Sequence, residues 1–372
     1  MRTPLSSPIP THSTLRHKID SVLKASPRWF VARLLPGLCA AALLVPFSSQ
    51  AQTLYIGNNY TNAYAVHGYN LTTGGAPTFT ITSEVGPPGA LLVSGDNLFV
   101  ANEYGKTVTK YNTTTGGAPI LTISTGGGFP SALTLSGNNL FAANPNTGTV
   151  AEYDATTGAP LMTISTGVGT SAPTSLLLSG NTLYVASGLY AGGTVREYNA
   201  TTGELILTIS SGISRPQAMV LSGNNLYVAN YNTNTVTEYD ATTGGEPVLS
   251  ISTGVLAPTA LALSGNHLFV ANHVYNGTVT EYDATNGGSP ISTISNVNQA
   301  EAMQLWGNNL YVAAGGIVTA YDTSNGGAIV QTFTDGVQGA FSLAISPTPE
   351  PGSALLLTVG LGLVGGFRRR RS

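Results

Sequence analysis

The stretch that decides the fold runs from Asn224 to Gly265 and reads NNLYVANYNTNTVTEYDATTGGEPVLSISTGVLAPTALALSG. A second stretch, DNLFVANEYGKTVTKYNTTTGGAPILTISTGGGFPSALTLSG from Asp96 to Gly137, aligns with it without a gap. Glycines close the LSG or LWG triplets of successive copies at intervals of 42 or 43 residues, at Gly95, Gly137, Gly180, Gly223, Gly265 and Gly307. The chain from Thr53 to Ser346 is therefore made of seven copies of one segment.

Each copy contains four short runs rich in Val, Ile, Leu, Thr and Tyr and bounded by Gly, Pro, Asn and Asp, which predicts four strands. In the deciding copy the predicted strands are Leu226 to Ala229, Thr235 to Tyr239, Val248 to Ser252 and Ala260 to Leu263. Ser222 to Asn225 predicts a tight hairpin, and Asp240 to Gly244 predicts an Asx-type turn followed by Gly. Pro258 stands just ahead of a strand, where its missing N–H does no harm.

A repeat of about 42 residues with four strands is typical of a β-propeller blade. The first copy begins at Leu54 to Asn58, which matches LYVAN, and so lacks the ALALS-type strand that precedes LYVAN in the other copies. The last copy ends on a strand of that type, Phe341 to Ser346. We therefore predict an all-β, seven-bladed propeller with four-stranded blades, closed by strands from both termini. Such a ring leaves few exposed sheet edges.

The first 51 residues predict a secretory signal peptide. A basic region precedes an apolar run, Leu34 to Phe47, and a small-x-small cleavage site at Ser49 to Ala51. The only cysteine, Cys39, lies in the apolar run, so we expect the mature protein to have no thiol and hence no disulfide or cysteine metal site. The propeller itself is predicted to span residues 52 to 346.

Residues 347 to 372 combine Pro349-Glu350-Pro351, an apolar stretch from Ala354 to Phe367, and four arginines, Arg368, Arg369, Arg370 and Arg371. This order of elements resembles the PEP-CTERM sorting signal of Gram-negative bacteria. The resemblance implies cleavage near the Pro-Glu-Pro by an exosortase and delivery to the cell surface or extracellular matrix. Fourteen apolar residues are fewer than the roughly 20 needed to span a bilayer, so we expect only transient membrane contact.

Charge excludes one class of partner. The whole chain carries a net charge of −3, but residues 52 to 346 have four basic side chains against fifteen acidic ones, which gives −11. Nucleic acid binding needs a positive footprint, so we do not expect a nucleic acid partner. Roughly 295 residues are ample for one large core, and we expect a monomer whose surface, apart from these acidic side chains, is hydrated, uncharged and rich in Thr, Asn, Ser and Gly.

The repeats resemble the YVTN and NHL types of propeller. The residues that carry this resemblance are Leu-Tyr-Val-Ala-Asn from 226 to 230, Thr-Val-Thr-Glu-Tyr-Asp from 235 to 240, and the Gly-rich turn that follows. The resemblance implies binding or scaffolding in most cases, and lactonase or lyase activity in a minority. Fold alone does not choose between these functions.

Comparison of the copies indicates where a site lies. The SGNN and DATTG joints are nearly uniform, whereas the segments after LYVAN and after LSIST vary, and in an up-and-down blade these two variable joints share one rim. Function tends to sit in irregular loops on a rigid scaffold. The candidate binding residues on this rim are Glu103, Tyr104, Tyr190, Arg215, Tyr231, His273, Tyr275 and Glu301. Further distinctive residues there are Glu84, Lys106, Phe129 and Asp335.

Other recurring residues have structural interpretations. Glu152, Glu197, Glu238 and Glu281 share a repeat position that holds Gly68, Lys110 and Ala320 in other copies, so we expect solvated strand residues. The asparagines that follow the LYVA-type strand of a copy are expected to bond backbone at the strand end; a polar ring at the channel mouth is the alternative. They are Asn58, Asn102, Asn144, Asn230 and Asn272. His67 and His267 are expected to be structural.

No triad or metal cluster is spelled out, because the three histidines of the propeller occupy different repeat positions. We therefore expect a non-catalytic binding or scaffold protein, for polysaccharide or a surface protein, without metal or cofactor. A metal-dependent lactonase- or lyase-like enzyme built on Glu103, His273 and Glu301 is the alternative. Ice binding is a third possibility suggested by the many threonines, but it needs a flat array that twisted blades do not provide.

Overall fold

The computed structural model describes residues 52–59, 64–167, 172–188, 190 and 192–346. These residues form seven antiparallel sheets of four strands each, with one short 3-10 helix, η2, at Thr323–Asn325. The predicted all-β propeller with seven four-stranded blades is confirmed. Within the described ranges, no helix has the length and apolar character needed to cross a membrane.

The seven blades are named A to G in chain order and each is described from the centre outward. The innermost strands are β28 (Ala340–Ile345), β4 (Pro88–Ser94), β8 (Ala132–Ser136), β12 (Pro173–Ser179), β16 (Pro216–Ser222), β20 (Pro258–Ser264) and β24 (Ala300–Trp306). The second strands are β1 (Thr53–Asn58), β5 (Asn97–Asn102), β9 (Asn139–Asn144), β13 (Thr182–Ser187), β17 (Asn225–Asn230), β21 (His267–Asn272) and β25 (Asn309–Ala314). The third strands are β2 (Ala65–Asn70), β6 (Thr107–Asn112), β10 (Thr149–Asp154), β14 (Thr194–Asn199), β18 (Thr235–Asp240), β22 (Thr278–Asp283) and β26 (Ile317–Asp322). The outermost strands are β3 (Phe79–Ile81), β7 (Leu121–Ser124), β11 (Pro160–Ser165), β15 (Leu205–Ile209), β19 (Leu249–Ile251), β23 (Gly287–Ser295) and β27 (Ala328–Phe333).

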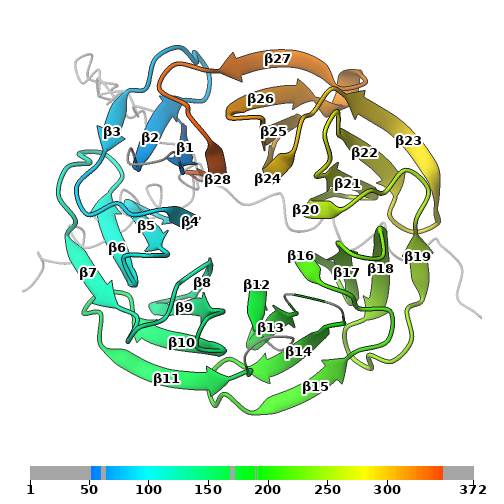
Figure 1. Ribbon diagram of the computed structural model, residues 1–372, viewed down its shortest axis with the longest axis horizontal. Coiled ribbons are helices and arrows are strands. Elements are labelled where there is room, and N and C mark those ends of the chain that lie inside the picture. The colour runs from blue at the N-terminus through cyan, green and yellow to red at the C-terminus, as the bar shows by residue number, and fades with distance from the viewer. Residues whose placement is uncertain (1–51, 60–63, 168–171, 189, 191, 347–372) are drawn as a thin grey trace, which may run out of the picture. The chain divides into compact units, whose positions relative to one another are not determined.

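Blade A joins the two ends of the propeller. Its strand order is β28-β1-β2-β3, so the last strand of the chain pairs with the first (Figure 1). In the antiparallel register Leu54 lies opposite Ile345 and Ile56 lies opposite Leu343. The predicted closure by both termini is therefore confirmed at the level of individual residue pairs.

The hydrophobic core lies between blades rather than inside any one of them. The second strands are buried over almost their whole length, because both of their faces pack against neighbouring blades. One such cluster joins Tyr227 and Ile251 of blade E to Leu268, Val270 and Tyr282 of blade F. Each blade therefore depends on its neighbours for burial of its apolar side chains.

The recurring tyrosines of the third strands link adjacent blades. The Tyr239 hydroxyl of blade E donates a hydrogen bond to the Ser211 carbonyl, which follows the outermost strand of blade D, at 2.6 Å. The same bond recurs from Tyr111 to Ser83 and from Tyr282 to Thr253. The tyrosine repeat thus has a structural explanation.

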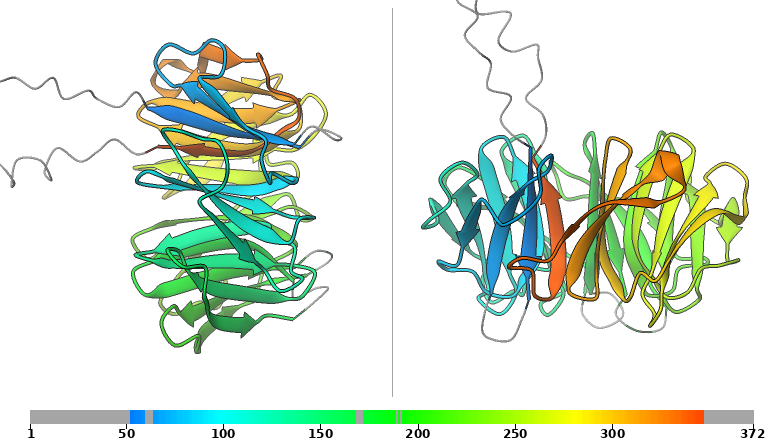
Figure 2. Two further views of the ribbon diagram at one scale, coloured as in Figure 1. Left: turned by 90° about the vertical axis from the view of Figure 1, so that its left-hand side faces the viewer. Right: turned by 90° about the horizontal axis from the view of Figure 1, so that it is seen from above.

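The SGNN and DATTG joints form one rim, called here the uniform rim. Gly223 takes a φ of 57° in its hairpin, a left-handed conformation that favours glycine. The Asp240 carboxylate accepts a hydrogen bond from the Thr242 amide, as the predicted Asx-type turn requires. Strand β1 begins and strand β28 ends at this rim, so both ends of the described domain lie on the same side of the ring (Figure 2).

Candidate functional site

The opposite rim, called here the variable rim, carries the joints between second and third strands and the joints between consecutive blades. The antiparallel strand order places both kinds of joint on one side of the ring. All of the candidate binding residues named from the sequence lie in these joints or in the strand ends that border them. The variable rim is therefore the place to look for a site.

Buried asparagines fix the variable loops to the scaffold. The Asn102 side chain at the end of β5 accepts a hydrogen bond from the Gly86 amide at 2.9 Å. Asn230 and Asn272 accept equivalent bonds from the amides of Ser214 and Leu256. The prediction that these asparagines bond backbone is confirmed, and it explains why they recur where the loops themselves vary.

Several non-glycine residues of this rim adopt left-handed backbone. Arg215 has a φ of 49° and Lys106 has a φ of 57°. Side chains with a Cβ disfavour this region by roughly 1 kcal/mol, and such residues cluster at functional sites more than elsewhere. The conformation turns the chain sharply just before β16, where Arg215 enters the channel mouth.

A cavity of about 470 Å³ occupies the centre of the ring at the variable rim. One residue from each blade, at the start of the innermost strand, lines it. These residues are Gly89, Ser131, Thr174, Gln217, Thr259, Glu301 and Phe341. Glu103 and Arg215 complete the polar part of the wall, so three of the predicted site residues meet in one cavity. Glu301 and Phe341 also line an adjoining cavity of about 380 Å³.

Glu103 leans into this cavity over Gly89. A Cβ built on Gly89 would lie 2.8 Å from the Glu103 Cγ, so any larger residue there would force the Glu103 side chain to move. Burial raises the pKa of the Glu103 carboxyl. Its carboxylate receives no hydrogen bond or ion pair from any residue of the described ranges, and it is therefore available to a ligand.

Glu301 and His273 form a pair beside the same opening. The Nδ1 of His273 lies 3.6 Å from the Glu301 Oε1 and 3.0 Å from the Ala300 carbonyl, to which it donates. Burial raises the pKa of the Glu301 carboxyl, while the neighbouring His273 acts in the opposite direction. No group of three or more His, Cys, Asp or Glu side chains that could hold a metal is found among the residues the structure describes.

Aromatic residues make up the rest of the rim. The Arg215 guanidinium stacks over the Tyr231 ring at 4.3 Å. The Lys106 Nζ lies 5.4 Å from the centroid of the Phe129 ring. The centroid of the Tyr104 ring lies 6.0 Å from the same centroid. Three tyrosines of this rim are largely exposed to solvent: Tyr104 (69%), Tyr190 (67%) and Tyr275 (78%). No ring contact of Tyr190 or Tyr275 is found within the described ranges.

Apart from Glu301, sequence reasoning missed the ring of channel-lining residues. The position after the proline that opens an innermost strand holds Thr174, Gln217 or Thr259 in successive blades. This position varies between copies while the flanking Pro and Ala scarcely change, and that contrast could have identified it as a candidate site position. The position was overlooked because it lies between the proline and the start of the predicted strand, as Thr259 does between Pro258 and Ala260, and not in one of the two variable loops.

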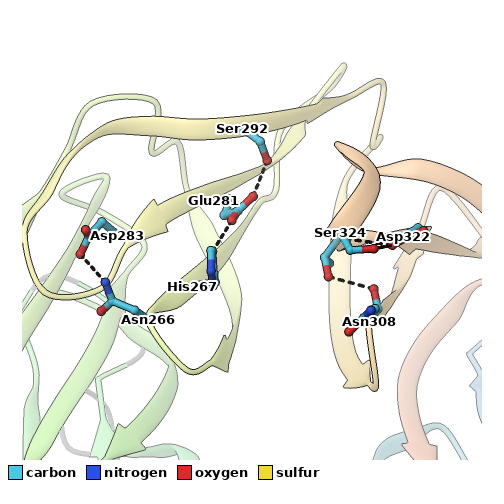
Figure 3. Close-up of polar contacts among 9 residues, drawn as sticks. Asn266, His267, Glu281, Asp283, Ser292, Asn308, Asp322 and Ser324 are labelled. Carbon is cyan, nitrogen blue, oxygen red and sulfur yellow. Dashed lines mark hydrogen bonds and ion pairs between the residues drawn. The ribbon is translucent and has the colours of Figure 1, made fainter.

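The expectation that the recurring glutamates are solvated is wrong. Glu152, Glu197, Glu238 and Glu281 are only 3 to 8% exposed, because the third strand lies between two packed blades. Figure 3 shows Glu281 between His267 and Ser292, whose hydrogen bonds to its carboxylate are each 2.6 Å long. His267 has the structural role that was predicted for it.

The predicted sorting residues, Pro349 to Pro351 and Arg368 to Arg371, lie outside the described residues, as does the predicted signal peptide. A family model for the PEP-CTERM protein-sorting motif matches residues 347–371. That motif indicates export and a surface or secreted location. The signal peptide stays a prediction.

Two solved structures share the fold. A putative 6-phosphogluconolactonase from Bacteroides fragilis NCTC 9343 has a TM-score of 0.65 and 18% sequence identity, with 81% of this chain and 100% of that chain covered. The computationally designed Ika8 protein has a TM-score of 0.60 and 17% identity, with 80% and 92% covered. Identities this low establish the fold alone. No curated protein is significantly similar to the chain in sequence.

A second family model matches residues 71–293, from the end of blade A into blade F. Its description is outer membrane protein assembly factor BamB, and the match covers more than half of the chain. The YVTN or NHL type of repeat is not the one found and stays a prediction. This propeller belongs to the family described as outer membrane protein assembly factor BamB.

Proposed function

We propose that this protein is an exported propeller of the cell surface or extracellular matrix that binds a polysaccharide through its variable rim, without catalysis. The observation that carries the proposal is the shared cavity of Glu103, Arg215 and Glu301 at the centre of a rim with three solvent-exposed tyrosines. Carboxylates accept hydrogen bonds from hydroxyl groups, and a guanidinium presents five donors. Aromatic rings supply flat apolar faces with a polar tip.

The position of the rim supports this proposal. Both ends of the described domain lie on the uniform rim, so a surface attachment through the C-terminal side leaves the variable rim facing away from it. The PEP-CTERM motif is consistent with processing by an exosortase. We propose that processing occurs near Glu350 and that the membrane is contacted only transiently.

A protein ligand is the other outcome of the binding proposal. The family description names an assembly factor for outer membrane proteins, and such a role concerns protein partners. Tyr and Arg are enriched at protein interfaces. We favour polysaccharide because the tyrosines are spread around the rim, with Tyr104, Tyr190 and Tyr275 in different blades, rather than gathered in one apolar patch.

A metal-dependent lactonase- or lyase-like enzyme is the alternative function. The observation that favours it is the His273 and Glu301 pair at the mouth of the cavity, in a fold shared with a putative lactonase. Catalytic metal sites commonly use three protein ligands, and this pair supplies two candidate ligands, with no group of three or more His, Cys, Asp or Glu side chains that could hold a metal found among the described residues. Binding without turnover is therefore the function that the geometry supports better.

Retention of the purified protein on extracellular polysaccharide tests the proposal. Tyr231→Ala removes the ring that holds Arg215, and Tyr275→Ala removes the most exposed tyrosine of the rim. We expect each change to weaken retention about tenfold, equivalent to about 1.4 kcal/mol. Tyr275→Ala should change the free energy of unfolding by no more than about 0.5 kcal/mol. Ile120→Ala, an exposed side chain before β7, is the matched control and should bind normally.

Three results would redirect the proposal. Unchanged retention in both tyrosine variants would remove the variable rim from consideration. Hydrolysis of a lactone or ester that requires a divalent metal and is lost in Glu103→Gln would establish the enzyme alternative. Failure to bind any polysaccharide, together with capture of one defined surface protein that Tyr275→Ala abolishes, would favour a protein ligand.

A further inference from the structure

The hydrogen-bond partner of each recurring third-strand glutamate depends on which residue opens the second strand of its blade. In blade C the Asn139 side chain, which opens β9, donates to the Glu152 carboxylate at 2.6 Å. In blade F His267, which opens β21, bonds Glu281 at the same distance (Figure 3). In both blades the residue that opens the second strand lies diagonally across from the glutamate on one face of the sheet, where long side chains can meet.

Blade D lacks this partner. The residue that opens β13 is Thr182, and it holds the same register, opposite Asn199 and diagonal to Glu197. Threonine is shorter than asparagine or histidine. Glu197 is only 3% exposed, and its Oε1 is fully buried with no hydrogen-bond partner. A buried polar atom without a partner costs free energy, and the cost is greater when the group is charged.

The groups around Glu197 favour its neutral form. Its cross-strand neighbours are Tyr184 on β13 and the apolar Leu207 on β15. The charged group of blade E that acts on it is Asp240, at the end of β18. Hydrogen bonds from Thr242 lower the pKa of Asp240, so this carboxylate stays ionised and repels a second negative charge. No cation is found facing Glu197 among the described residues.

We propose that the contact between blades D and E is a pH-sensitive joint, held closed by neutral Glu197 and loosened when that carboxyl ionises. Burial first, and Asp240 second, raise the pKa of Glu197 from 4.5 to about 7. A group whose folded-state pKa is raised contributes stability that is complete at low pH and is lost as the pH rises through the folded value. The joint is therefore tightest in mild acid and weakens near neutrality.

The same joint is connected through the chain to the variable rim. Strand β15 of blade D leads directly into Arg215, which begins blade E and stacks on Tyr231. Three other seams differ, because Asn139 and His267 bond the equivalent glutamates and Lys110 donates to the Ala155 carbonyl of the next blade at 3.0 Å. Among the described third-strand glutamates, Glu197 is the one with a carboxyl oxygen buried without a hydrogen-bond partner, and Thr182 stands where blades C and F have the donor.

Denaturant unfolding of the purified protein between pH 5.5 and pH 8.5 tests the proposal. From pH 6 to pH 8 a shift of this size raises the unfolding equilibrium constant about tenfold. Glu197→Gln is neutral at every pH and should remove that rise. Thr182→Asn restores the donor found in blade C and should reduce the rise while keeping the carboxyl. Glu152→Gln, at a seam where the glutamate already has a donor, is the matched control and should keep the rise.

Hydrogen exchange locates the effect. After correction for the intrinsic dependence of exchange on pH, peptides from 194–209 and 235–244 should lose protection as the pH rises from 6 to 8. Peptides from 149–165 and 278–295 should not. Glu197→Gln and Thr182→Asn should both protect the first pair at pH 8. An undiminished pH response in Thr182→Asn and in Glu197→Gln would overturn the proposal, as would equal loss of protection at every seam. If Glu197→Gln fails to fold, Thr182→Asn alone decides between these outcomes.

Discussion

The two rims of this propeller are built from the same seven repeats but by different means. On the uniform rim the hairpins and Asx turns satisfy their own polar groups, as where Asn266 donates to Asp283 (Figure 3). The Asp283 carboxylate also accepts from the Thr285 amide. On the variable rim the loops differ in length, and Arg215 and Lys106 hold left-handed backbone. The three most exposed tyrosines of the described residues lie there as well.

The difference shows where the chain is free to vary. Short turns that bond within themselves accept few sequences, since they need Asx side chains and glycine at fixed places. In blades B, E and F the loops of the variable rim are anchored by the buried asparagine at the end of the second strand. The rest of each loop is then available for binding.

Removal of the closing strand should have the largest effect, because it breaks both rims at once. Deleting Phe341 to Ser346 exposes the backbone edge of β1 and the faces that β28 buries against β4 and β24. We expect cooperative unfolding to be lost, as followed by circular dichroism during heating. A truncated protein that melts in one transition at the temperature of the intact protein would show that the ring does not depend on its closure.

Asn230→Ala should have an intermediate effect and tests whether the loop anchors are structural. The side chain is fully buried, accepts from the Ser214 amide, and donates to Thr237 at 2.8 Å. Its loss leaves buried partners unpaired, so we expect the free energy of unfolding in urea to fall by about 1 to 3 kcal/mol. Asn224→Ala, an exposed residue of the uniform rim, should change it by less than about 0.5 kcal/mol. Equal effects would contradict the contrast between anchor and surface.

The smallest expected effect is that of acid on the free energy of unfolding. Acid should reduce the contribution of an Asx-turn aspartate on the uniform rim, and should reduce that of an aspartate on the variable rim less. Hydrogen bonds from Asn286 and Asn266 lower the pKa of Asp283 from 3.8 to about 2. A lowered folded-state pKa gives stability that is present above the unfolded value and is lost as the pH falls through about 2. The stability difference between the native protein and Asp283→Asn should therefore shrink from pH 4 to pH 2 in urea unfolding. Asp335→Asn on the variable rim serves as control, and an identical trend there would remove the distinction.

Repetition made most of the fold predictable from the sequence. The pairing of Ile345 with Leu54 follows from which strand the first copy lacks, and the glycine at 223 follows from the hairpin. Of the predicted site residues, Glu103, Arg215 and Glu301 meet in one cavity, whereas Tyr190 and Tyr275 stand apart. The repeat pattern does not tell how far apart residues of different blades lie across the ring. The structure was therefore needed to show which site residues share a cavity.

By itself the sequence determined the number of blades, the closing strand and the identity of the irregular rim, because each follows from local pattern and from counting. Only the tertiary structure decided the environment of the third-strand glutamates. Alternation along a strand tells which residues share a face, but burial of Glu197 depends on the next blade, about 40 residues away in the chain. The missing donor at Thr182 matters for the same reason, because only packing between blades D and E makes an unpaired carboxyl costly.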